Sequence, residues 1–403
     1  MPKIKKKILL ISHNFWPENF QINDVVEHLS DHYELSVLTG KPNYPKGKIF
    51  KNYNAFKFDV EKFKRKIDIM RVPIIPRGRG NSFMKVLNYF SFIFSSFIFL
   101  TFKSIKKYDL IFVYAPSPVI HSILGIYLKK LKKIPIILWL QDLWPVSIES
   151  SGKIKNKFIL RIIGKIINFI YANVDVLLIQ SKAYKKHLIG KIEPSKIFYI
   201  PNTCKEYFRN VRKTKNKELK IIYSGNIGLV QEFDTIIYAA KKIQKMGLNI
   251  TFIFYGEGVK KQNFINKVEK NNLKNIMIMN YIKINRLIEK VYDSDVLFVS
   301  LKNFKELNLT IPSKIQFYMS MRKPILAEAS GESAKIIKDS NSGLVSFPGD
   351  KNALLKNIIK FYKLKNKHKL NRLGLNGYKY FKNNFSLKIV TTKIRKCINQ
   401  IEY

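Results

Sequence analysis

The sequence predicts an α/β protein of two doubly wound domains, each with a parallel sheet covered by helices. Apolar strand-like runs alternate with amphipathic helical segments from one end of the chain to the other. The length of 403 residues is enough for two domains with separate cores. A polar stretch of weak periodicity, residues 202–220, separates two series of this alternation. Together these observations predict two Rossmann-like domains.

The first series contains the strands of the predicted N-terminal domain. Runs without polar alternation, such as 134–140, are typical of strands buried on both faces of a parallel sheet. Helices are expected between the strands, for example over 117–133 and 156–174. The predicted strands are 7–12, 34–39, 67–72, 109–115, 134–140, 175–180 and 197–202.

The second series gives the C-terminal domain. Its predicted strands are 219–226, 250–258, 275–281, 295–301, 323–329 and 343–347. The chain ends in an amphipathic segment that we expect to pack back on the N-terminal domain. The predicted organisation is an N-terminal domain 1–203, a linker 204–218, a C-terminal domain 219–385 and a C-terminal helix 386–403.

Composition limits the partners that the chain can have. The net charge of +45 favours an anionic partner such as a membrane surface, although a compositional preference for lysine explains it equally well. No zinc-finger, cold-shock or RNP-type signature is present, which disfavours nucleic acid. Cys204 and Cys397 lie far apart, so no disulfide framework is expected and a reducing cytoplasm fits.

An uncharged segment, 86–102, lies inside a predicted helix 82–105. Its length is just below that of a membrane-spanning helix. The strands predicted on either side belong to one sheet, and a bilayer cannot divide a sheet. We therefore expect a helix in the membrane interface, with an ordinary buried helix as the alternative. The cations expected at anionic headgroups are Lys85, Lys103, Lys106 and Lys107.

Glycines follow two strands of the C-terminal domain at positions where backbone N–H groups can contact phosphate. Gly225 and Gly228 lie in the stretch 223–228, after the strand-like run 220–222, and Gly256 lies in the stretch 255–258, after the strand-like run 250–254. Each may equally be a simple turn. Neither stretch matches G-x-G-x-x-G and no P-loop lysine is present, so nicotinamide and ATP sites are disfavoured.

Three charged side chains are the candidate catalytic residues. Asp142 follows the buried run 134–140, at the strand end where α/β sheets bind ligands. Lys314 enters a helix behind Pro312, where a cation and a helix N-terminus suit a diphosphate. Glu332 stands in a later loop, where it can accept hydrogen bonds from sugar hydroxyls. The alternatives are a capping role for Asp142 and an ordinary helix-start acid at Glu332.

No metal site is expected. The sequence has no H-E-x-x-H and no paired C-x-x-C. The D-S-D triplet at 293–295 imitates a metal-binding motif of sugar transferases. It falls at a predicted helix end, where aspartate commonly caps or links elements.

Several stretches, in order along nearly the whole chain, resemble family 4 of the retaining glycosyltransferases. The closest resemblance is to the bacterial branch that builds O-antigen and capsule and includes L-fucosamine (N-acetylfucosamine) transferases. The fold of that family is GT-B, two Rossmann-like domains facing a cleft. The matching stretches are 11–24, 38–50, 113–118, 140–152, 223–240, 255–258, 308–326 and 331–350.

The resemblance implies transfer of a sugar, such as an N-acetylated amino sugar, from a UDP-sugar with retention. The acceptor would be a polyprenyl-diphosphate-linked saccharide in O-antigen, capsule or exopolysaccharide synthesis. No metal cofactor is implied. The protein would be cytoplasmic and peripheral on the inner membrane, and Asp142 would face the cleft. Two alternatives remain, a sugar-nucleotide epimerase of the same fold and a non-catalytic membrane-associated assembly partner.

The resemblance also implies site residues in each domain. The donor would contact Gly225, Asn226, Gly228, Gly256, Glu257, Ile282, Lys302, Glu306 and Ser313, beside the catalytic candidates Asp142, Lys314 and Glu332. The acceptor side would include His13, Trp16, Glu18, Asn43, Tyr44 and Trp144.

The sequence departs from the family pattern at its charged positions. Asn226 and Gln231 replace the arginine and lysine that usually grip the diphosphate. Leu309 and Phe317 replace the usual pair of glutamates, and Gln141 replaces a histidine. The cationic role is therefore expected to pass to Lys314 first and Lys302 second, and the acidic role to Glu306 and Glu332.

Overall fold

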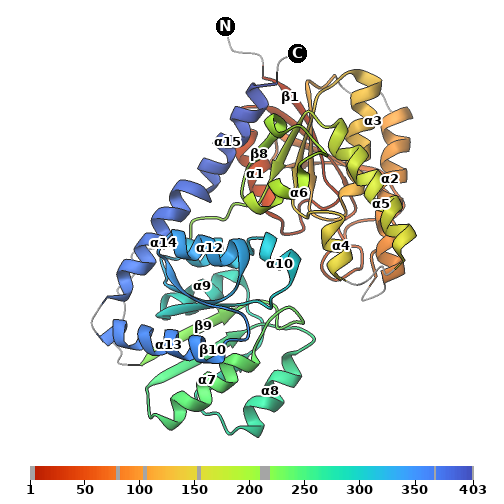
Figure 1. The fold of residues 1–403 in the computed structure, drawn as a ribbon. Coiled ribbons are helices and arrows are strands. Elements are labelled where there is room, and N and C mark those ends of the chain that lie inside the picture. Colours follow the sequence, from red (N-terminus) through yellow and green to blue (C-terminus); the bar gives the residue numbers. More distant parts are fainter. Residues whose placement is uncertain are drawn as a thin grey trace. The chain divides into compact units, whose positions relative to one another are not determined.

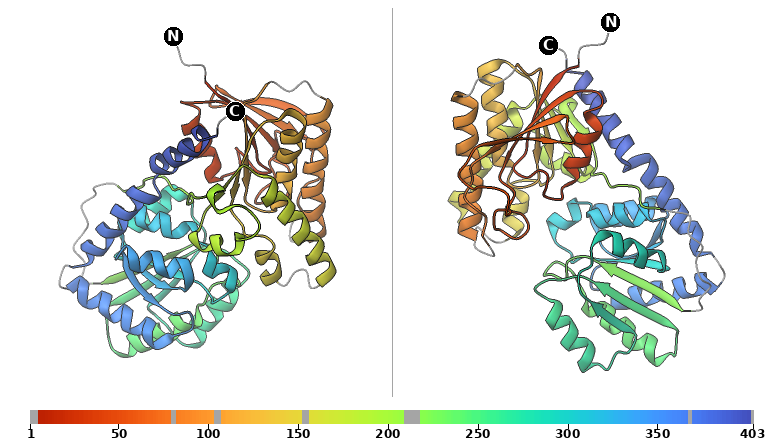
Figure 2. Two further views of the ribbon diagram at one scale, coloured as in Figure 1. Left: turned by 45° about the horizontal axis from the view of Figure 1, so that its top comes forward. Right: turned by 180° about the vertical axis from the view of Figure 1, so that it is seen from behind.

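The computed structural model describes residues 5–78, 82–102, 107–151, 156–208, 218–366 and 369–401. The chain divides into two compact units (Figure 1). Unit 1 contains Met1–Pro201 and Val390–Tyr403, and unit 2 contains Asn202–Ile389. Each unit is a mainly parallel sheet with helices on both faces (Figure 2), so the predicted α/β fold is confirmed.

Unit 1 has an eight-stranded sheet in the order β3-β4-β2-β1-β5-β6-β7-β8. All neighbours are parallel except β3 and β4, which are antiparallel. The sequence prediction missed β3, because this edge strand is charged and only partly buried. The strands are β1 Lys7–Ile11, β2 Glu34–Gly40, β3 Asp59–Phe63, β4 Ile67–Val72, β5 Leu110–Ala115, β6 Ile136–Leu140, β7 Val176–Ile179 and β8 Ile197–Tyr199.

Helices cover both faces of this sheet. The first face carries α2, α3 and α5, and the second carries α1 and α15 (Figures 1 and 2). The Thr391 hydroxyl of α15 lies 3.1 Å from His28 Nδ1 of α1, so the C-terminal helix packs on unit 1. The helices are α1 Gln21–Leu29, α2 Ser82–Phe102, α3 Ile123–Lys132, α4 Val146–Ser151, α5 Lys157–Asn173, α6 Lys185–Leu188 and α15 Leu387–Asn399.

Unit 2 has a fully parallel six-stranded sheet in the order β11-β10-β9-β12-β13-β14. Its strands are β9 Leu219–Ser224, β10 Ile250–Tyr255, β11 Ile276–Met279, β12 Val296–Ser300, β13 Ile325–Glu328 and β14 Gly343–Ser346. Its helices are α7 Asp234–Lys245, α8 Lys261–Lys270, α9 Ile284–Tyr292, α10 Lys305–Leu309, α11 Ser313–Ser320, α12 Gly331–Asp339, α13 Lys351–Asn366 and α14 Leu370–Asn384. One apolar core fills each face of the sheet.

The topology gives each unit one place where a ligand is expected. In unit 1 the strand order reverses beside β1, which pairs with both β2 and β5. In unit 2 it reverses beside β9, which pairs with both β10 and β12. Open α/β sheets bind ligands outside the carboxyl ends of the strands at such a reversal. A ligand site is therefore expected at the loops after β1, β5, β9 and β12.

Helix α2 is the apolar helix expected at 82–105, and its described part ends at Phe102. Lys103 and Lys106, two of the expected headgroup contacts, lie outside the described residues. The buried residues of α2 recur at every fourth position: Asn88, Phe92, Ser96 and Leu100. Only 22% of its most apolar 18-residue window is buried, although its length and composition would allow it to cross a membrane. Most of this helix is therefore not buried in the core of unit 1.

Candidate functional site

The loops after β9 and β10 touch each other backbone to backbone. Gly225, with a φ of 140°, donates its N–H to the Tyr255 carbonyl oxygen at 2.9 Å. A Cβ atom on Gly256 would lie 1.9 Å from the Gly225 carbonyl oxygen. Only glycine permits this approach at Gly256, and only glycine adopts the Gly225 conformation without strain. The paired glycines predicted to form a phosphate-binding loop therefore form one joined loop structure.

Two further contacts hold this joined loop. The Ile227 N–H donates to the Glu257 carbonyl oxygen at 2.8 Å. The Glu257 carboxylate forms an ion pair with Lys261 at 2.8 Å and accepts the Tyr281 N–H at 3.3 Å. The expected donor residue Glu257 thus braces the loops after β10 and β11, and its backbone rather than its carboxylate meets the β9 loop.

Polar side chains fix the second half of the β9 loop. The Asn226 carbonyl oxygen accepts the Tyr223 hydroxyl at 2.5 Å. The Gly228 N–H donates to the Gln231 Oε1 at 2.9 Å. Gln231, which stands where the resembling family has a cation, therefore holds the loop itself. The cation that the sequence leads us to expect beside this loop is therefore not at this position.

Lys314 supplies that cation from the first turn of α11. Its Nζ donates to the Tyr223 hydroxyl at 3.0 Å and lies 4.1 Å from the centre of the Tyr223 ring. A Cβ atom on Gly225 would lie 3.0 Å from the same Nζ. No carboxylate pairs with Lys314 among the described residues, and desolvation lowers its pKa to about 7. A partly buried amine that no described carboxylate pairs, beside a glycine loop and a helix N-terminus, is a strong position for an anion.

The remaining donor-side predictions fall on neighbouring loops. The Lys302 N–H, after β12, donates to the Val230 carbonyl oxygen at 2.9 Å, so it contacts the β9 loop through its backbone. Glu306 of α10 has one buried carboxylate oxygen without a hydrogen-bond partner. Ser313 is exposed at the start of α11, and Ile282 packs at the edge of the core.

Glu332 is in the first turn of α12, which begins against α10. Gly331 has a φ of 61°, and a Cβ atom there would lie 2.0 Å from the Asn308 carbonyl oxygen. This close contact brings the first turn of α12, with Glu332, next to the helix that carries Glu306. The two acids expected to replace the missing glutamate pair therefore come from adjoining elements.

The D-S-D triplet lies at the opposite edge of the sheet, before β12. Asp295 accepts the Lys220 N–H at 2.9 Å and forms an ion pair with Lys365 at 2.7 Å. These contacts give it the linking role that the sequence predicted. In the part of the chain that the structure describes, no group of three His, Cys, Asp or Glu side chains is placed to hold a metal ion.

In unit 1, Glu18 joins the loops after β1 and β2. Its buried carboxylate accepts the N–H groups of Asn43 at 2.7 Å and Tyr44 at 2.6 Å. It also accepts the Asn14 side-chain amide at 2.8 Å. Burial raises the pKa of Glu18, and these three donors oppose the rise. The carboxylate is thus occupied, and its role is to position Tyr44.

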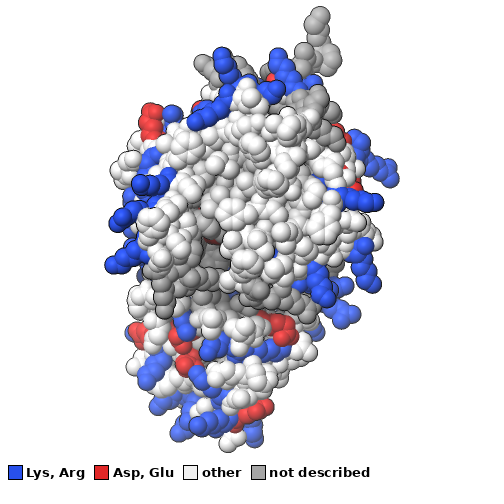
Figure 3. All heavy atoms as spheres, turned by 90° about the vertical axis from the view of Figure 1, so that its right-hand side faces the viewer, with Lys and Arg blue, Asp and Glu red and all other residues white. Residues whose placement is uncertain are grey.

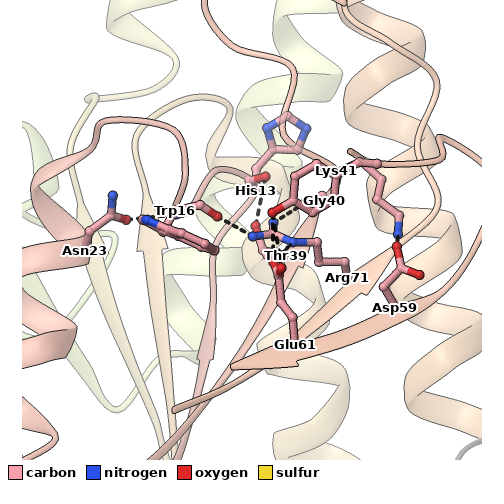
Figure 4. A network of polar contacts seen from close by, with 10 residues as sticks. His13, Trp16, Asn23, Thr39, Gly40, Lys41, Asp59, Glu61 and Arg71 are labelled. Carbon is pink, nitrogen blue, oxygen red and sulfur yellow. Dashed lines mark hydrogen bonds and ion pairs between the residues drawn. The ribbon is translucent and has the colours of Figure 1, made fainter. Parts of the chain in front are cut away.

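Arg71, a residue of β4, holds the loops after β1 and β2 in place (Figure 4). This fully buried side chain donates to the Gly40 carbonyl oxygen at 3.1 Å and to the Trp16 carbonyl oxygen, and it forms an ion pair with Glu61. The Trp16 N–H donates to Asn23 at 3.1 Å. The backbone of Trp16 is therefore fixed on both sides while its ring stays partly exposed.

His13 follows β1 and faces α2. It is 2% exposed, and burial lowers its pKa to about 4, so the imidazole is neutral. Its ring centre lies 5.3 Å from that of Tyr89 and 5.0 Å from that of Phe92. Its Nε2 atom is buried without a hydrogen-bond partner. His13 therefore offers one unused polar atom at the strand-order reversal of unit 1.

Asp142 follows β6 at the same edge of the sheet. Burial raises its pKa to about 6, and a hydrogen bond from Ser117 opposes the rise. The carboxylate also raises the pKa of nearby tyrosine hydroxyls, which places it in a ring of tyrosines. They are Tyr89, Tyr114, Tyr171 and Tyr184. A carboxylate with a raised pKa in such surroundings is suited to accepting a proton.

Trp144 lies directly after this acid. Its N–H donates to the Asp142 carbonyl oxygen at 3.2 Å, and its own carbonyl oxygen accepts the Tyr171 hydroxyl at 3.1 Å. Gln141, on the other side, has a buried Nε2 without a hydrogen-bond partner. Unit 1 thus has Asp142, Trp144 and His13 after its strands β6 and β1, at the carboxyl edge of its sheet.

The sequence did not single out Arg77, Tyr89 or Ser117. Tyr89 lies within the apolar helix, where an aromatic residue is read as packing. Ser117 lies in a loop of ordinary composition. Arg77 is one of many cations in a very basic chain. Only the fold brings them beside Asp142 and Tyr44.

Comparisons with known proteins show which family, relatives and solved structures the chain is similar to. Residues 205–380 match the family model "Glycosyl transferases group 1". The chain is 24% identical over 291 residues to the "Putative colanic acid biosynthesis glycosyl transferase WcaI" of Escherichia coli (strain K12), covering 67% of this chain and 70% of that protein.

Two solved structures show the same fold at low identity. The sucrose-phosphate synthase of Thermosynechococcus elongatus is 15% identical with a TM-score of 0.73, over 98% of this chain and 99% of that one. Anabaena Alr3699/HepE in complex with UDP and glucose is 13% identical with a TM-score of 0.66, over 98% and 100%. The chain has the GT-B fold, and its segment 205–380 is similar to the glycosyl transferases group 1 family.

Proposed function

We propose that this protein transfers a sugar from a UDP-sugar to a polyprenyl-diphosphate-linked saccharide, with retention at the anomeric carbon, in the assembly of a bacterial surface polysaccharide. The observation that carries the proposal is the partly buried Lys314 amine, which no carboxylate of the described residues pairs, beside the joined glycine loop of unit 2. The likeness to WcaI supports the polysaccharide, and the UDP bound to Alr3699/HepE supports the nucleotide.

In unit 2 the diphosphate of the donor would lie against Lys314, the N-terminus of α11 and the backbone around Gly225. The amine becomes fully charged when an anion approaches, since the anion offsets the desolvation that now lowers its pKa. Negative charge that develops on the leaving UDP is then met by donors already in place. Such preorganised donors lower the barrier to breaking the bond between sugar and phosphate.

In unit 1 Asp142 would orient the acceptor hydroxyl and accept its proton. A pKa of about 6 leaves the carboxylate mostly ionised at pH 7, yet basic enough to take a proton as the new bond forms. Glu332 and Glu306 would contact hydroxyls of the donor sugar. Retention would follow from attack on the face of the sugar from which UDP leaves, so no protein nucleophile is assigned and no metal is expected.

The outer helices of unit 1 fit a membrane surface. Helix α3 lies between α2 and α5, and none of the three contains an acidic residue. Figure 3 shows a broad area without charged side chains over these helices, bordered by Lys and Arg. We call this area the apolar face, and the exposed large side chains of its helices include Phe83, Phe90, Phe94, Phe158, Ile162 and Phe169.

An anionic lipid surface suits the apolar face because exposed Lys157, Arg161 and Lys165 lie on the same helix as Phe158. A spanning helix is disfavoured, since α2 connects β4 to β5 and both strands belong to one sheet. The proposal therefore places the protein in the cytoplasm, peripheral on the inner membrane, where a polyprenyl-linked acceptor would be available.

The donor site is tested by thermal unfolding with UDP, GDP, CMP or ADP. A ligand at one hundred times its dissociation constant adds about 2.7 kcal/mol to the free energy of unfolding. We expect UDP alone to stabilise the protein, and Lys314→Ala to lose that stabilisation. Lys302→Ala is the matched control, because Lys302 follows the neighbouring strand β12. We expect this variant to lose less of the stabilisation by UDP than Lys314→Ala.

Two outcomes would count against the proposal. Stabilisation by UDP that survives Lys314→Ala would remove Lys314 from the donor site. No shift with any of the four nucleotides would remove the donor site itself, and would favour the non-catalytic assembly partner instead.

A further inference from the structure

Arg77, in the loop between β4 and α2, has aromatic rings in place of an acidic partner. Its guanidinium carbon lies 5.5 Å from the centre of the Tyr44 ring and 5.7 Å from that of the Tyr89 ring. Its backbone N–H donates to the Asn43 side chain at 3.3 Å, which fixes the loop. No carboxylate pairs with Arg77 in the described parts of the chain. The rings hold the cation in place without neutralising it.

The two rings are themselves held in place. Tyr44 is fixed through its backbone by the buried Glu18 carboxylate. Tyr89 packs edge-on against His13 and is close enough to Asp142 for the carboxylate to raise its pKa. Arg77 is thus held on a rigid aromatic support, one side chain away from the proposed proton acceptor.

Arg77 is connected to the apolar face through α2, the helix that carries Tyr89. Tyr89 belongs to α2, and the same helix exposes Phe90 and Phe94 one and five residues further on. Exposed aromatic side chains, a cation and an acid therefore occur around one helix, with Tyr89 in contact with Arg77 and near Asp142. A lipid-linked sugar has three matching parts, a hydrocarbon chain, a diphosphate and a hydroxyl-bearing sugar.

We propose that Arg77 binds the diphosphate of the lipid-linked acceptor. A guanidinium offers two parallel N–H donors to phosphate oxygens, and those donors are not used by a carboxylate here. The Glu18 carboxylate does not compete with an anion for Arg77, since it is buried and already accepts three hydrogen bonds. This inference rests on the proposed function and names the acceptor-binding residue that the function requires.

The test uses farnesyl diphosphate and farnesol in neutral detergent as matched probes with and without the diphosphate. The full chain carries Lys314→Ala in every sample, so that the proposed donor site does not contribute. We expect Arg77→Gln to weaken farnesyl diphosphate binding at least about tenfold, because one charge-assisted bidentate contact is lost. Farnesol binding should change less than twofold, and Arg77→Lys should recover part of the loss.

Arg65→Gln is the matched control. Arg65 is an exposed arginine in the turn between β3 and β4, at the other end of β4 from Arg77. It removes the same charge from unit 1 and should leave binding of farnesyl diphosphate unchanged. Equal binding of this probe by Arg77→Gln and its parent, or no preference of the parent for farnesyl diphosphate over farnesol, would overturn the proposal.

Two further arms separate the possible sources of phosphate. Binding to phosphatidylglycerol vesicles should be the same for Arg77→Gln and its parent. An equal loss on vesicles would assign Arg77 to lipid headgroups instead and would overturn the acceptor site. In an otherwise unchanged chain, Arg77→Gln should keep the stabilisation by UDP. Unchanged farnesyl diphosphate binding by Arg77→Gln, with UDP stabilisation intact, would contradict the acceptor site alone. The absence of UDP stabilisation in the unchanged chain would contradict the proposed function.

Discussion

At the scale of single residues, Lys314 is the side chain whose protonation is expected to change when an anionic ligand binds. Among the described residues its amine contacts the Tyr223 hydroxyl and ring and no carboxylate, and desolvation lowers its pKa to about 7. A diphosphate would supply the missing counter-charge and raise that pKa again. Binding of UDP above pH 7 should therefore be accompanied by uptake of a proton.

Proton uptake is measurable by titration calorimetry in buffers of different ionisation enthalpy. At pH 8 we expect close to one proton taken up per UDP bound, and at pH 6 close to none from Lys314, since the amine is already charged there. Lys314→Met should abolish the uptake at pH 8. Binding of UDP to the unchanged protein at pH 8 without proton uptake would contradict the low pKa.

The same amine makes a stability prediction for the protein without ligand. Its pKa of about 7 in the folded state lies below the ordinary lysine value of the unfolded chain. Between these two values the unfolded state binds more protons, so the contribution of Lys314 to stability rises with pH, by at most about 1.4 kcal/mol per pH unit. Lys314→Met should therefore stabilise the protein more at pH 7 than at pH 9, as measured by denaturant unfolding. An equal effect at both pH values would contradict the account.

Asp142 gives the second prediction from a titrating group. Its pKa is raised to about 6 by burial, and a general base works only while ionised. Sugar transfer should fall as the pH drops through about 6, approaching tenfold per pH unit. Asp142→Asn should lower the rate constant by about 10²–10⁴ and remove that dependence. A variant that keeps the original rate and pH profile would exclude Asp142 as the base.

At the scale of elements, the apolar face depends on two helices rather than one. The sequence drew attention to α2 because its apolar segment is uninterrupted. Helix α5 was predicted as an ordinary amphipathic helix of the sheet, since Arg161 and Lys165 interrupt its apolar residues. The fold leaves Phe94 of α2 67% exposed and Phe158 of α5 66% exposed on the same side of unit 1. Both helices should therefore contribute to lipid binding.

Vesicle co-sedimentation tests the two helices separately. Phe94→Asp on α2 and Phe158→Asp on α5 should each weaken binding to phosphatidylglycerol-containing vesicles about tenfold, because burial of one large apolar side chain contributes about 1.5–3 kcal/mol. Phe347→Asp is the matched control, as Phe347 of unit 2 is 57% exposed. A loss with Phe94→Asp alone would restrict the docking surface to α2. Equal losses in all three variants would exclude the apolar face as a specific surface.

At the scale of the whole molecule, the fold was predictable because its strands are buried on both faces and read as apolar runs. Runs such as 134–140 and 250–258 correspond to β6 and β10 with small differences at their ends. The edge strand β3 was missed, because its alternating charges at Asp59, Glu61 and Lys62 resemble a loop. A strand buried on both faces can be recognised by its apolar run. An edge strand is only partly buried, so its sequence lacks such a run.

The site was predictable in part, where a residue's position along a strand decides its place. Asp142 and Gly225 follow buried strands, and parallel topology brings such residues to one edge of each sheet. Arg77 could not be found this way, since its significance comes from the rings of Tyr44 and Tyr89, which are 33 and 12 positions away. Glu18 could be found but not interpreted, because only the fold shows that three donors occupy its carboxylate.

The most direct measurement is the mass of the lipid product after incubation with a panel of UDP-sugars and a polyprenyl-diphosphate-linked N-acetylhexosamine. The account predicts that one UDP-sugar adds a single sugar to the lipid and releases one UDP per product. It also predicts that Asp142→Asn and Lys314→Ala lose this product while remaining folded. Release of UDP without a lipid product, or no turnover with any donor that binds, would contradict it.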